Sequence, residues 1–175
     1  MMKKNKAIFL DRDGVINEDL DYVHKIEDFK IFPGVFEALK MLQSAGFKLI
    51  IITNQAGIGR GYYTEEDFFK LNNHMLEIFE KQGIKINEVY FCPHKPEDNC
   101  ECRKPKIKFI GQAIEKFNLD IKECWLIGDK IIDIEMGEKA GCKSLLIFSK
   151  YVKNIKRRKF KDLEEAAQFI LNKNN

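Results

Sequence analysis

Two aspartates, Asp11 and Asp13, follow the short apolar run at residues 7–10 and stand directly before Gly14. A buried strand that ends in two carboxylates is costly unless the charges meet a cation or take part in chemistry. Because side chains alternate along an extended chain, we expect Asp11 and Asp13 on one side and Arg12 on the other. The alternative is a polar strand end followed by a turn, since Asp-Gly is a common turn pair.

Polar groups also follow a second apolar run, at residues 47–52. Thr53, Asn54, Gln55 and Ala56 come next and lead into a glycine-rich stretch that ends at Gly61. A hydroxyl and an amide at the carboxyl end of a strand can hydrogen-bond an oxyanion, and glycines let a ligand approach the backbone closely. The alternative is a flexible glycine loop with a threonine cap.

Two adjacent cations, Arg103 and Lys104, precede a proline after a third strand-like run at residues 88–91. Such a pair can bind phosphate, although exposed cations are more often solvated surface. A further apolar run, at residues 124–127, leads into Asp129 and Lys130. An aspartate at this position either adds to a shared site or serves the start of a helix, where the helix dipole favours negative charge.

Cysteine and histidine are concentrated in residues 92–102, as Cys92, His94, Cys100 and Cys102. Three thiolates and one imidazole form a closed tetrahedral ligand set for Zn²⁺, which leaves no open position and indicates a structural site. We expect the metal to fix this loop and the two cations that follow it. The alternative is a set of exposed reduced cysteines, which would be a reactive liability.

The length, net charge and apolar content of the chain indicate its class of fold and its expected location. The chain has 175 residues, 45% hydrophobic and 33% charged, with a formal net charge of +3. This predicts one globular domain spanning residues 1–175, without any need for a polyanionic partner. There is no apolar stretch long enough to cross a bilayer and no signal-peptide pattern, so we expect a cytoplasmic protein that needs no membrane or nucleic-acid partner and acts as a monomer.

Strand-like and helical segments alternate along the chain, which is typical of a parallel sheet with helices on both faces. Thr64 and Asp67 form a near capping box at the start of the second helix. We therefore predict a three-layer, Rossmann-like α/β fold, with strands at residues 7–10, 47–52, 88–91, 124–127 and 144–148 and helices at 35–44, 65–82, 107–117, 132–139 and 163–171.

Carboxyl ends of parallel strands meet at one edge of a sheet, where ligands bind. The four polar segments would then bring several carboxylates and cations together, a set that suits Mg²⁺ and a phosphoryl group. In their order they resemble the four motifs of the haloacid dehalogenase superfamily of phosphohydrolases, over about residues 6–150. The motifs are Asp11-Arg12-Asp13-Gly14, Thr53-Asn54, Arg103-Lys104-Pro105, and Gly128-Asp129-Lys130 with Asp133.

Shorter stretches resemble one family within that superfamily, the D-glycero-D-manno-heptose 1,7-bisphosphate phosphatases. They lie at residues 9–14 with 16–17, at 22–24, at 53–61 and at 92–94. This resemblance implies removal of the 7-phosphate during synthesis of nucleotide-activated heptose for lipopolysaccharide or another surface glycan. The related histidinol-phosphate phosphatases are the alternative within enzymes, and a zinc-bearing interaction module is the alternative outside them. Nucleic-acid binding by the basic segment at residues 153–161 is a further alternative to a solvated face.

The resemblance also implies roles for individual residues. Asp11 is the nucleophile that forms an aspartyl-phosphate, and Asp13 is the general acid and base. Mg²⁺ is held by Asp11, Asp129 and the backbone carbonyl of Asp13, while Thr53 and Lys104 hold the phosphoryl oxygens. Asp133 is expected to anchor Lys130 or a metal-bound water. The implied substrate contacts are Asp19, Leu20, Asp21, Tyr22, Thr53, Asn54, Gln55, Ala56, Arg103, Lys104 and Lys130.

The segment between the first two motifs, residues 15–52, is largely filled by one predicted helix and one strand. A separate cap domain therefore does not fit there. We expect the loops at residues 15–32, 56–63 and 92–102 to shape the pocket, which would leave it open enough for a polar sugar phosphate.

Overall fold

A six-stranded, wholly parallel sheet forms the centre of the protein in a computed structural model that describes residues 4–173. Its spatial order is β3-β2-β1-β4-β5-β6. The strands are β1 (Lys6–Leu10), β2 (Phe47–Asn54), β3 (Ile86–Cys92), β4 (Trp125–Gly128), β5 (Lys143–Ile147) and β6 (Lys159–Phe160).

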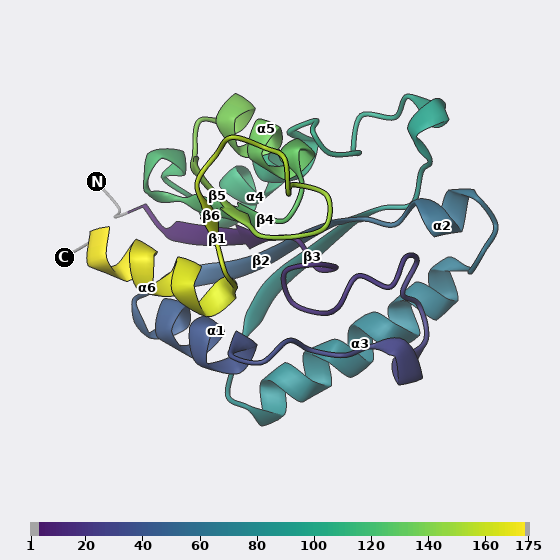
Figure 1. The fold of residues 1–175 in the computed structure, drawn as a ribbon, viewed down its shortest axis with the longest axis horizontal. Helices are drawn as coiled ribbons and strands as arrows, with labels where there is room; N and C mark the ends of the chain where they lie inside the picture. The colour runs from purple at the N-terminus through teal and green to yellow at the C-terminus, as the bar shows by residue number, and fades with distance from the viewer. Residues whose placement is uncertain (1–3, 174–175) are drawn as a thin grey trace.

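Helices cover both faces of this sheet, as the sequence predicts (Figure 1). One side carries α1 (Val35–Ser44), α3 (Glu65–Lys81) and α6 (Leu163–Lys173), and the other carries α4 (Lys108–Phe117) and α5 (Ile131–Ala140). The four-residue helix α2 (Ala56–Gly59) follows β2 directly. Single 3₁₀ turns lie at Ile26–Asp28, Pro96–Asp98 and Ile121–Glu123. The three-layer prediction is confirmed.

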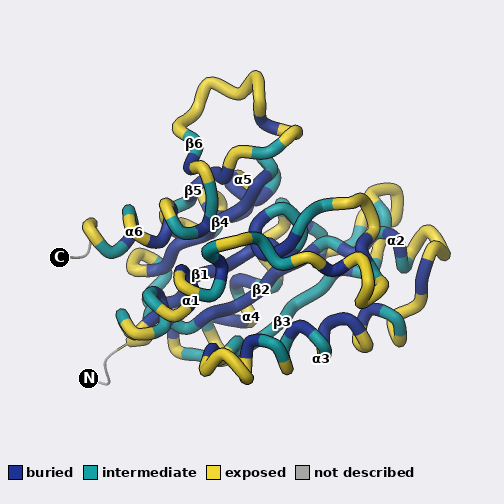
Figure 2. Tube along the Cα trace, turned by 60° about the horizontal axis from the view of Figure 1, so that its bottom comes forward, coloured by how far each residue is buried: buried dark blue, intermediate teal, exposed yellow. Residues whose placement is uncertain are grey.

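Strand β1 shows why its sequence is continuously apolar. Ile8 and Leu10 belong to the core beneath α1, α3 and α6, whereas Ala7 and Phe9 belong to the core beneath α4 and α5. A central strand that is covered on both faces requires apolar side chains at every position. Figure 2 shows β1 and its neighbours buried in the middle of the molecule.

Local signals set most helix boundaries. Thr64 accepts a hydrogen bond from the backbone N–H of Asp67, whose carboxylate accepts one from the N–H of Thr64, so the predicted capping box starts α3. Gly141, at φ +84°, ends α5 in the left-handed conformation that glycine adopts without strain.

The structure adds two elements that the sequence pattern did not indicate. The glycine stretch after β2 was expected to be a loop, but it contains α2. The short strand β6 pairs with the end of β5 through Leu146 and Ile147. Both are too short to show a periodic pattern in the sequence.

The sheet order places β1 between β2 and β4, so the chain changes direction across the sheet at β1. In open parallel sheets, ligands bind at this topological switch point, beyond the carboxyl ends of the strands. The loops after β1, β2 and β3 extend on this side of the molecule, beside α2 (Figure 1). None of the helices in the described part of the chain is long and apolar enough to span a membrane.

Candidate active site

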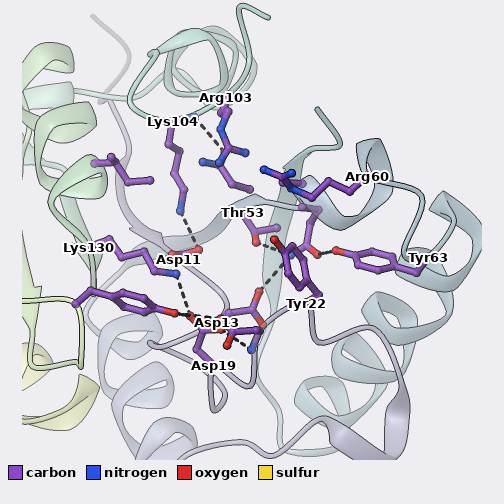
Figure 3. A pocket seen from close by; sticks show the side chains of 16 residues that line it. Asp11, Asp13, Asp19, Tyr22, Thr53, Arg60, Tyr63, Arg103, Lys104 and Lys130 are labelled. Atoms are coloured by element: carbon purple, nitrogen blue, oxygen red, sulfur yellow. Dashed lines mark hydrogen bonds and ion pairs between the residues drawn. The ribbon is translucent and has the colours of Figure 1, made fainter. Parts of the chain in front are cut away.

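A cavity of about 300 Å³ lies at the carboxyl edge of the sheet. Side chains from the loops after β1, β2, β3, β4 and β5 line it, and Figure 3 shows several of them pointing inward. The lining residues are Asp11, Asp13, Asp19, Asp21, Tyr22, Thr53, Asn54, Gln55, Ala56, Arg60, Tyr63, Arg103, Lys104, Lys130, Ile132 and Tyr151.

Lys104 and two carboxylates form a buried charge cluster on the cavity floor. The Lys104 Nζ atom lies 2.9 Å from Asp11 Oδ1 and 2.7 Å from Asp133 Oδ1, and it also donates to the Ile52 carbonyl at 3.1 Å. Burial lowers the pKa of Lys104, but the two carboxylates outweigh this effect and leave that pKa raised. The side chain therefore stays a cation although it is only 4% exposed.

Asp129 lies beside this cluster, fully buried, and its two carboxylate oxygens have no hydrogen-bond partner among the described residues. Burial raises its pKa to about 8, and the neighbouring Asp11 carboxylate adds to the rise. Burial likewise raises the pKa of Asp11 to about 6, opposed by Lys104. An ionised carboxylate this deep, with no donor, requires a cation.

Oxygen atoms of Asp11, Asp129 and Asp133 all lie within 4.8 Å of one another. Because Asp133 is already paired with Lys104, the free oxygens of Asp129 and the second oxygen of Asp11 are the ones open to an ion. Hard oxygen ligands of this kind suit Mg²⁺. This donor set fits the Mg²⁺ ion expected from the sequence.

Asp13 lies at the cavity wall, and its carboxylate is held by donors on three sides. Arg12 Nη2 lies 3.0 Å from each oxygen, Asn17 Nδ2 donates at 2.9 Å, and Gln55 Nε2 donates at 3.2 Å. Arg12 was expected to point away from the aspartates. That expectation is wrong, because β1 ends at Leu10 and the strict alternation of an extended chain ends with it.

Gln55 links Asp13 to the side wall of the cavity. Its Nε2 group also donates to Thr53 Oγ1 at 2.7 Å, and its Oε1 atom accepts from the Tyr63 hydroxyl at 2.5 Å. Because a carboxylate only accepts hydrogen bonds, Gln55 presents its NH2 group to Asp13, and its Oε1 atom is left to accept from the Tyr63 hydroxyl. The Tyr63 ring in turn stacks on His24, with centroids 4.7 Å apart.

Asp133, in the first turn of α5, bonds the side chain of Lys104 and the backbone of Lys130. Its second oxygen accepts from the backbone N–H of Lys130 at 3.1 Å. It was expected to anchor Lys130 or a metal-bound water, and the structure shows that its side-chain partner is Lys104. The Lys130 ammonium instead lies 2.9 Å from Asp19 Oδ2, which crosses the cavity from the first loop.

The loop after β3 gathers the predicted zinc ligands. Cys92 Sγ lies 3.1 Å from Cys102 Sγ and 3.5 Å from Cys100 Sγ, and His94 Nδ1 lies 3.3 Å from Cys102 Sγ. A tetrahedral zinc site with Zn–S bonds of about 2.3 Å separates its sulfurs by roughly 3.7 Å, so four atoms this close fit one ion. The cluster could bind zinc.

Arg103 and Lys104 follow this cluster directly. The Arg103 Nη1 atom donates to the His94 carbonyl at 3.1 Å, and the backbone N–H of Lys104 donates to Asn54 Oδ1 at 3.1 Å. The folded metal loop thus carries both cations to the edge of the cavity, which agrees with the expectation from their sequence order.

Most of the predicted substrate contacts line this cavity, but Leu20 does not. Its side chain is 50% exposed and is absent from the cavity wall, because the loop around it points Asp19 and Asp21 inward instead. Arg60 and Tyr63 were not named individually, although they lie in the loop at residues 56–63 that was expected to shape the pocket, whereas Ile132 and Tyr151 were missed altogether. Arg60 and Tyr63 adjoin the glycine stretch and could have been suspected there, whereas nothing near Tyr151 marked it.

A family model described as a haloacid dehalogenase-like hydrolase matches residues 4–141. This region contains all four strand-end motifs. The chain belongs to the haloacid dehalogenase-like hydrolases. The resemblance seen in the motifs is therefore confirmed at the level of the family.

Curated relatives of this hydrolase are similar along most of its length. A protein of Campylobacter jejuni named D-glycero-alpha-D-manno-heptose-1,7-bisphosphate 7-phosphatase is 46% identical over 171 residues, covering 97% of this chain and 98% of the relative. A protein of Helicobacter pylori named as the corresponding beta-D-manno phosphatase is 47% identical over 147 residues, covering 83% and 85% of the two chains.

A solved structure agrees in fold with this haloacid dehalogenase-like hydrolase. The D,D-heptose 1.7-bisphosphate phosphatase from B. bronchiseptica, complexed with magnesium and phosphate, superposes with a TM-score of 0.85 at 26% identity. The match covers 97% of this chain and 99% of that one. The two proteins therefore share their fold over nearly the whole of both chains.

Proposed function

We propose that this hydrolase is a Mg²⁺-dependent phosphomonoesterase that removes the 7-phosphate of D-glycero-D-manno-heptose 1,7-bisphosphate through an aspartyl-phosphate. The observation that carries the proposal is the buried set of Asp11, Lys104 and Asp129 at the switch point of the sheet. Similarity over 97% of the chain to a relative with that name supports the substrate class.

Asp11 is the proposed nucleophile. Its Oδ1 atom is bonded to Lys104 and its backbone N–H to the Ile127 carbonyl, so the side chain is held at the cavity floor. As its oxygen forms a bond to phosphorus, the bond between phosphorus and the sugar oxygen breaks, and negative charge develops on the phosphoryl oxygens in the transition state. Lys104 and the Thr53 hydroxyl both line the cavity and can stabilise that charge.

A bound Mg²⁺ would neutralise the repulsion between the nucleophile and an anionic phosphate ester. Asp129, with its two unpartnered oxygens, and the free oxygen of Asp11 would hold it, together with the backbone carbonyl of Asp13. The two carboxylates whose pKa values are raised in the protein alone, Asp11 and Asp129, would then be ionised at neutral pH.

Asp13 is the proposed acid and base. It would give a proton to the leaving sugar oxygen and then take one from the water that hydrolyses the aspartyl-phosphate. Its bonds to Arg12, Asn17 and Gln55 hold the carboxylate in a fixed orientation at the wall. The role fits its position in the cavity, two residues from the nucleophile.

The remainder of the cavity suits a polar substrate with a second phosphate. Asp19 and Asp21 offer acceptors for sugar hydroxyls, while the guanidinium groups of Arg60 and Arg103 face the cavity at its far side (Figure 3). Guanidinium groups bind phosphate through paired hydrogen bonds. Arg103 has no carboxylate partner among the described residues, so its charge is available to such a group.

The zinc cluster has a structural role in this proposal. It closes the loop at residues 92–102, whose end carries Arg103 and Lys104 into the cavity. With four protein ligands, the metal would have no open position for catalysis. Its contribution to activity would thus come from holding these two cations.

A substrate panel tests the proposal against its closest alternative. Phosphate release is measured with Mg²⁺ on both anomers of heptose 1,7-bisphosphate, on histidinol phosphate and on p-nitrophenyl phosphate. We expect kcat/KM for one or both heptose anomers to exceed the value for histidinol phosphate by at least a hundredfold. A preference for histidinol phosphate would contradict the assigned substrate while leaving the phosphatase chemistry intact.

A further inference from the structure

Tyr151 lies at the rim of the cavity, on the loop between β5 and β6, which belongs to none of the four motifs. Two neighbours fix this part of the loop. Ser149 Oγ donates to the Asp129 carbonyl at 2.7 Å, and Val152 is fully buried against Ile134 and Leu146. The anchors on either side of Tyr151 hold its backbone, although the residue is 42% exposed.

The hydroxyl of Tyr151 reaches across to the first loop. It lies 3.0 Å from Asp19 Oδ2 and 3.4 Å from Asp21 Oδ1, which are separated from Tyr151 by about 130 residues of chain. The face of the ring lies under the ammonium of Lys130, with Nζ 4.4 Å from the centroid. One side chain thus contacts all three of the charged groups at this end of the cavity.

The segment that Tyr151 contacts has an unusual backbone conformation, which is supported both from within, where the Asp21 N–H donates to Asp19 Oδ1 at 3.1 Å, and from the β5–β6 loop. Asp21 and Tyr22 have φ angles of 58° and 57°, in the left-handed region that costs non-glycine residues free energy. Such a conformation persists only where surrounding contacts determine it. Asp21 receives the Tyr151 hydroxyl and also faces the Lys150 ammonium at 3.6 Å, so both contacts come from the β5–β6 loop.

We propose that Tyr151 is a positioning residue for the sugar moiety of the substrate. Its hydroxyl donates to Asp19 and holds Asp21 nearby, so that the remaining carboxylate lone pairs face the cavity and can accept hydrogen bonds from substrate hydroxyls. The hydroxyl of Tyr151 bonds Asp19 and Asp21 and not Asp11, Lys104 or Asp129, and Tyr151 therefore acts on recognition of the sugar, not on phosphoryl transfer.

This inference rests on the proposed function in one respect, namely that Asp19 and Asp21 face a polyhydroxylated leaving group. It goes beyond that function in assigning part of the specificity to a loop outside the four motifs. This division of roles between the rim and the floor of the cavity can be tested by kinetics. A phosphate ester without sugar hydroxyls should depend on Asp11, Lys104 and Asp129 on the floor but not on Tyr151 at the rim.

The test compares Tyr151→Phe with the wild type on heptose 1,7-bisphosphate and on p-nitrophenyl phosphate. Loss of a hydrogen bond to a charged acceptor should raise KM for the sugar phosphate about tenfold. We expect kcat on the sugar phosphate, and both constants on p-nitrophenyl phosphate, to stay within twofold. Tyr90→Phe makes the same chemical change on β3, where the ring stacks on Phe109 away from the cavity, and serves as the matched control.

An Asp19→Asn background tests whether Tyr151 acts through Asp19. In that background, Tyr151→Phe should change KM less than twofold further, since the charged acceptor is already gone. An unchanged KM in the single variant, an equal loss on both substrates, or fully additive losses in the double variant would each overturn the proposal.

Failure of the proposed function is a separate result. If the wild type does not hydrolyse heptose bisphosphate, the substrate assignment fails, and the same comparison is then made on whichever sugar phosphate it does hydrolyse. The ratio between Tyr151→Phe and the wild type still decides whether this residue positions the sugar-binding carboxylates.

Discussion

The ammonium of Lys104 joins Asp11 to Asp133, with Nζ 2.9 Å from the first carboxylate and 2.7 Å from the second. The three residues follow different strands, with Asp133 in the first turn of α5, and they are almost completely buried. Removing either carboxylate would still leave Lys104 one anionic partner, whereas removing Lys104 would leave two buried carboxylates without their shared cation. The cluster is therefore tolerant of a change at Asp11, which allows a clean test there.

Asp11→Asn should abolish turnover, with kcat falling at least a thousandfold, because an amide cannot attack phosphorus at a useful rate. The fold should persist, since the amide has nearly the same shape and Lys104 keeps its bond to Asp133. Phosphate release measures the loss of turnover, and the far-ultraviolet circular dichroism spectrum checks that the fold persists. Substantial remaining activity would remove Asp11 from the role of nucleophile.

The stability of the Mg²⁺-free protein should fall as pH rises. Burial raises the pKa of Asp11 to about 6 and that of Asp129 to about 8, both above their values in the unfolded chain. The folded state therefore binds more protons than the unfolded state between about pH 4 and 8. The free energy of unfolding should decrease through this window, and the melting temperature should fall with it.

Mg²⁺ should reverse this trend, since it binds the ionised carboxylates and releases their protons. Thermal denaturation at pH 5 and pH 8, after dialysis with and without Mg²⁺, measures the effect. The rise in melting temperature on adding Mg²⁺ should be larger at pH 8, and Asp129→Asn should remove most of it. A larger rise at pH 5 would contradict the assignment of these carboxylates to the metal.

Gly14 controls the space around Asp129. A Cβ atom at this position would lie 2.3 Å from Asp129 Oδ2, and the backbone φ of +90° also disfavours any other residue. Gly14→Ala should displace the carboxylate and reduce kcat/KM by at least a hundredfold at ordinary Mg²⁺ concentrations. Steady-state kinetics with increasing Mg²⁺ should show a weakened metal dependence.

Gly111→Ala is the matched control for that variant. Gly111 lies within α4, and an added Cβ would meet nothing within 4 Å. Alanine there should leave activity unchanged and raise stability by about 0.5–1 kcal/mol, through the lower conformational entropy of the unfolded chain. Equal losses of activity in the two variants would show that the effect at Gly14 is not specific to Asp129.

Zinc should be present at about one ion per chain and should resist removal by dialysis. Cys100→Ser should lower the zinc content and reduce activity through Arg103 and Lys104, which follow the cluster directly. Cys124→Ala, at a buried cysteine outside the cluster, should keep its zinc. Elemental analysis checks both, and metal-replete wild-type protein without zinc would refute the proposed ligand set.

The sequence was sufficient to predict the three-layer fold because the longer helices and strands carry local signals, which the short elements α2 and β6 do not. Strand β1 is apolar on both faces, and the capping box at Thr64 and Asp67 marks the start of α3. The motifs could be placed in one site because a parallel sheet brings strand ends together at one edge. Neither inference requires knowledge of side-chain conformation.

The details that were missed depend on conformation in loops. Arg12 turns back onto Asp13 because the strand has already ended, and Leu20 points outward while its neighbours Asp19 and Asp21 point inward. Tyr151 reaches the site only because Ser149 and Val152 fix a loop that no motif marks. Such positions follow from tertiary contacts between distant segments, which no spacing in a single sequence encodes.

The most direct test of the account is to follow heptose 1,7-bisphosphate by ³¹P nuclear magnetic resonance during turnover with Mg²⁺. We predict that only the 7-phosphate signal disappears, that inorganic phosphate appears in equal amount, and that Asp11→Asn produces neither change. Loss of the 1-phosphate signal, or no release from this substrate alongside rapid release from histidinol phosphate, would contradict the proposed function.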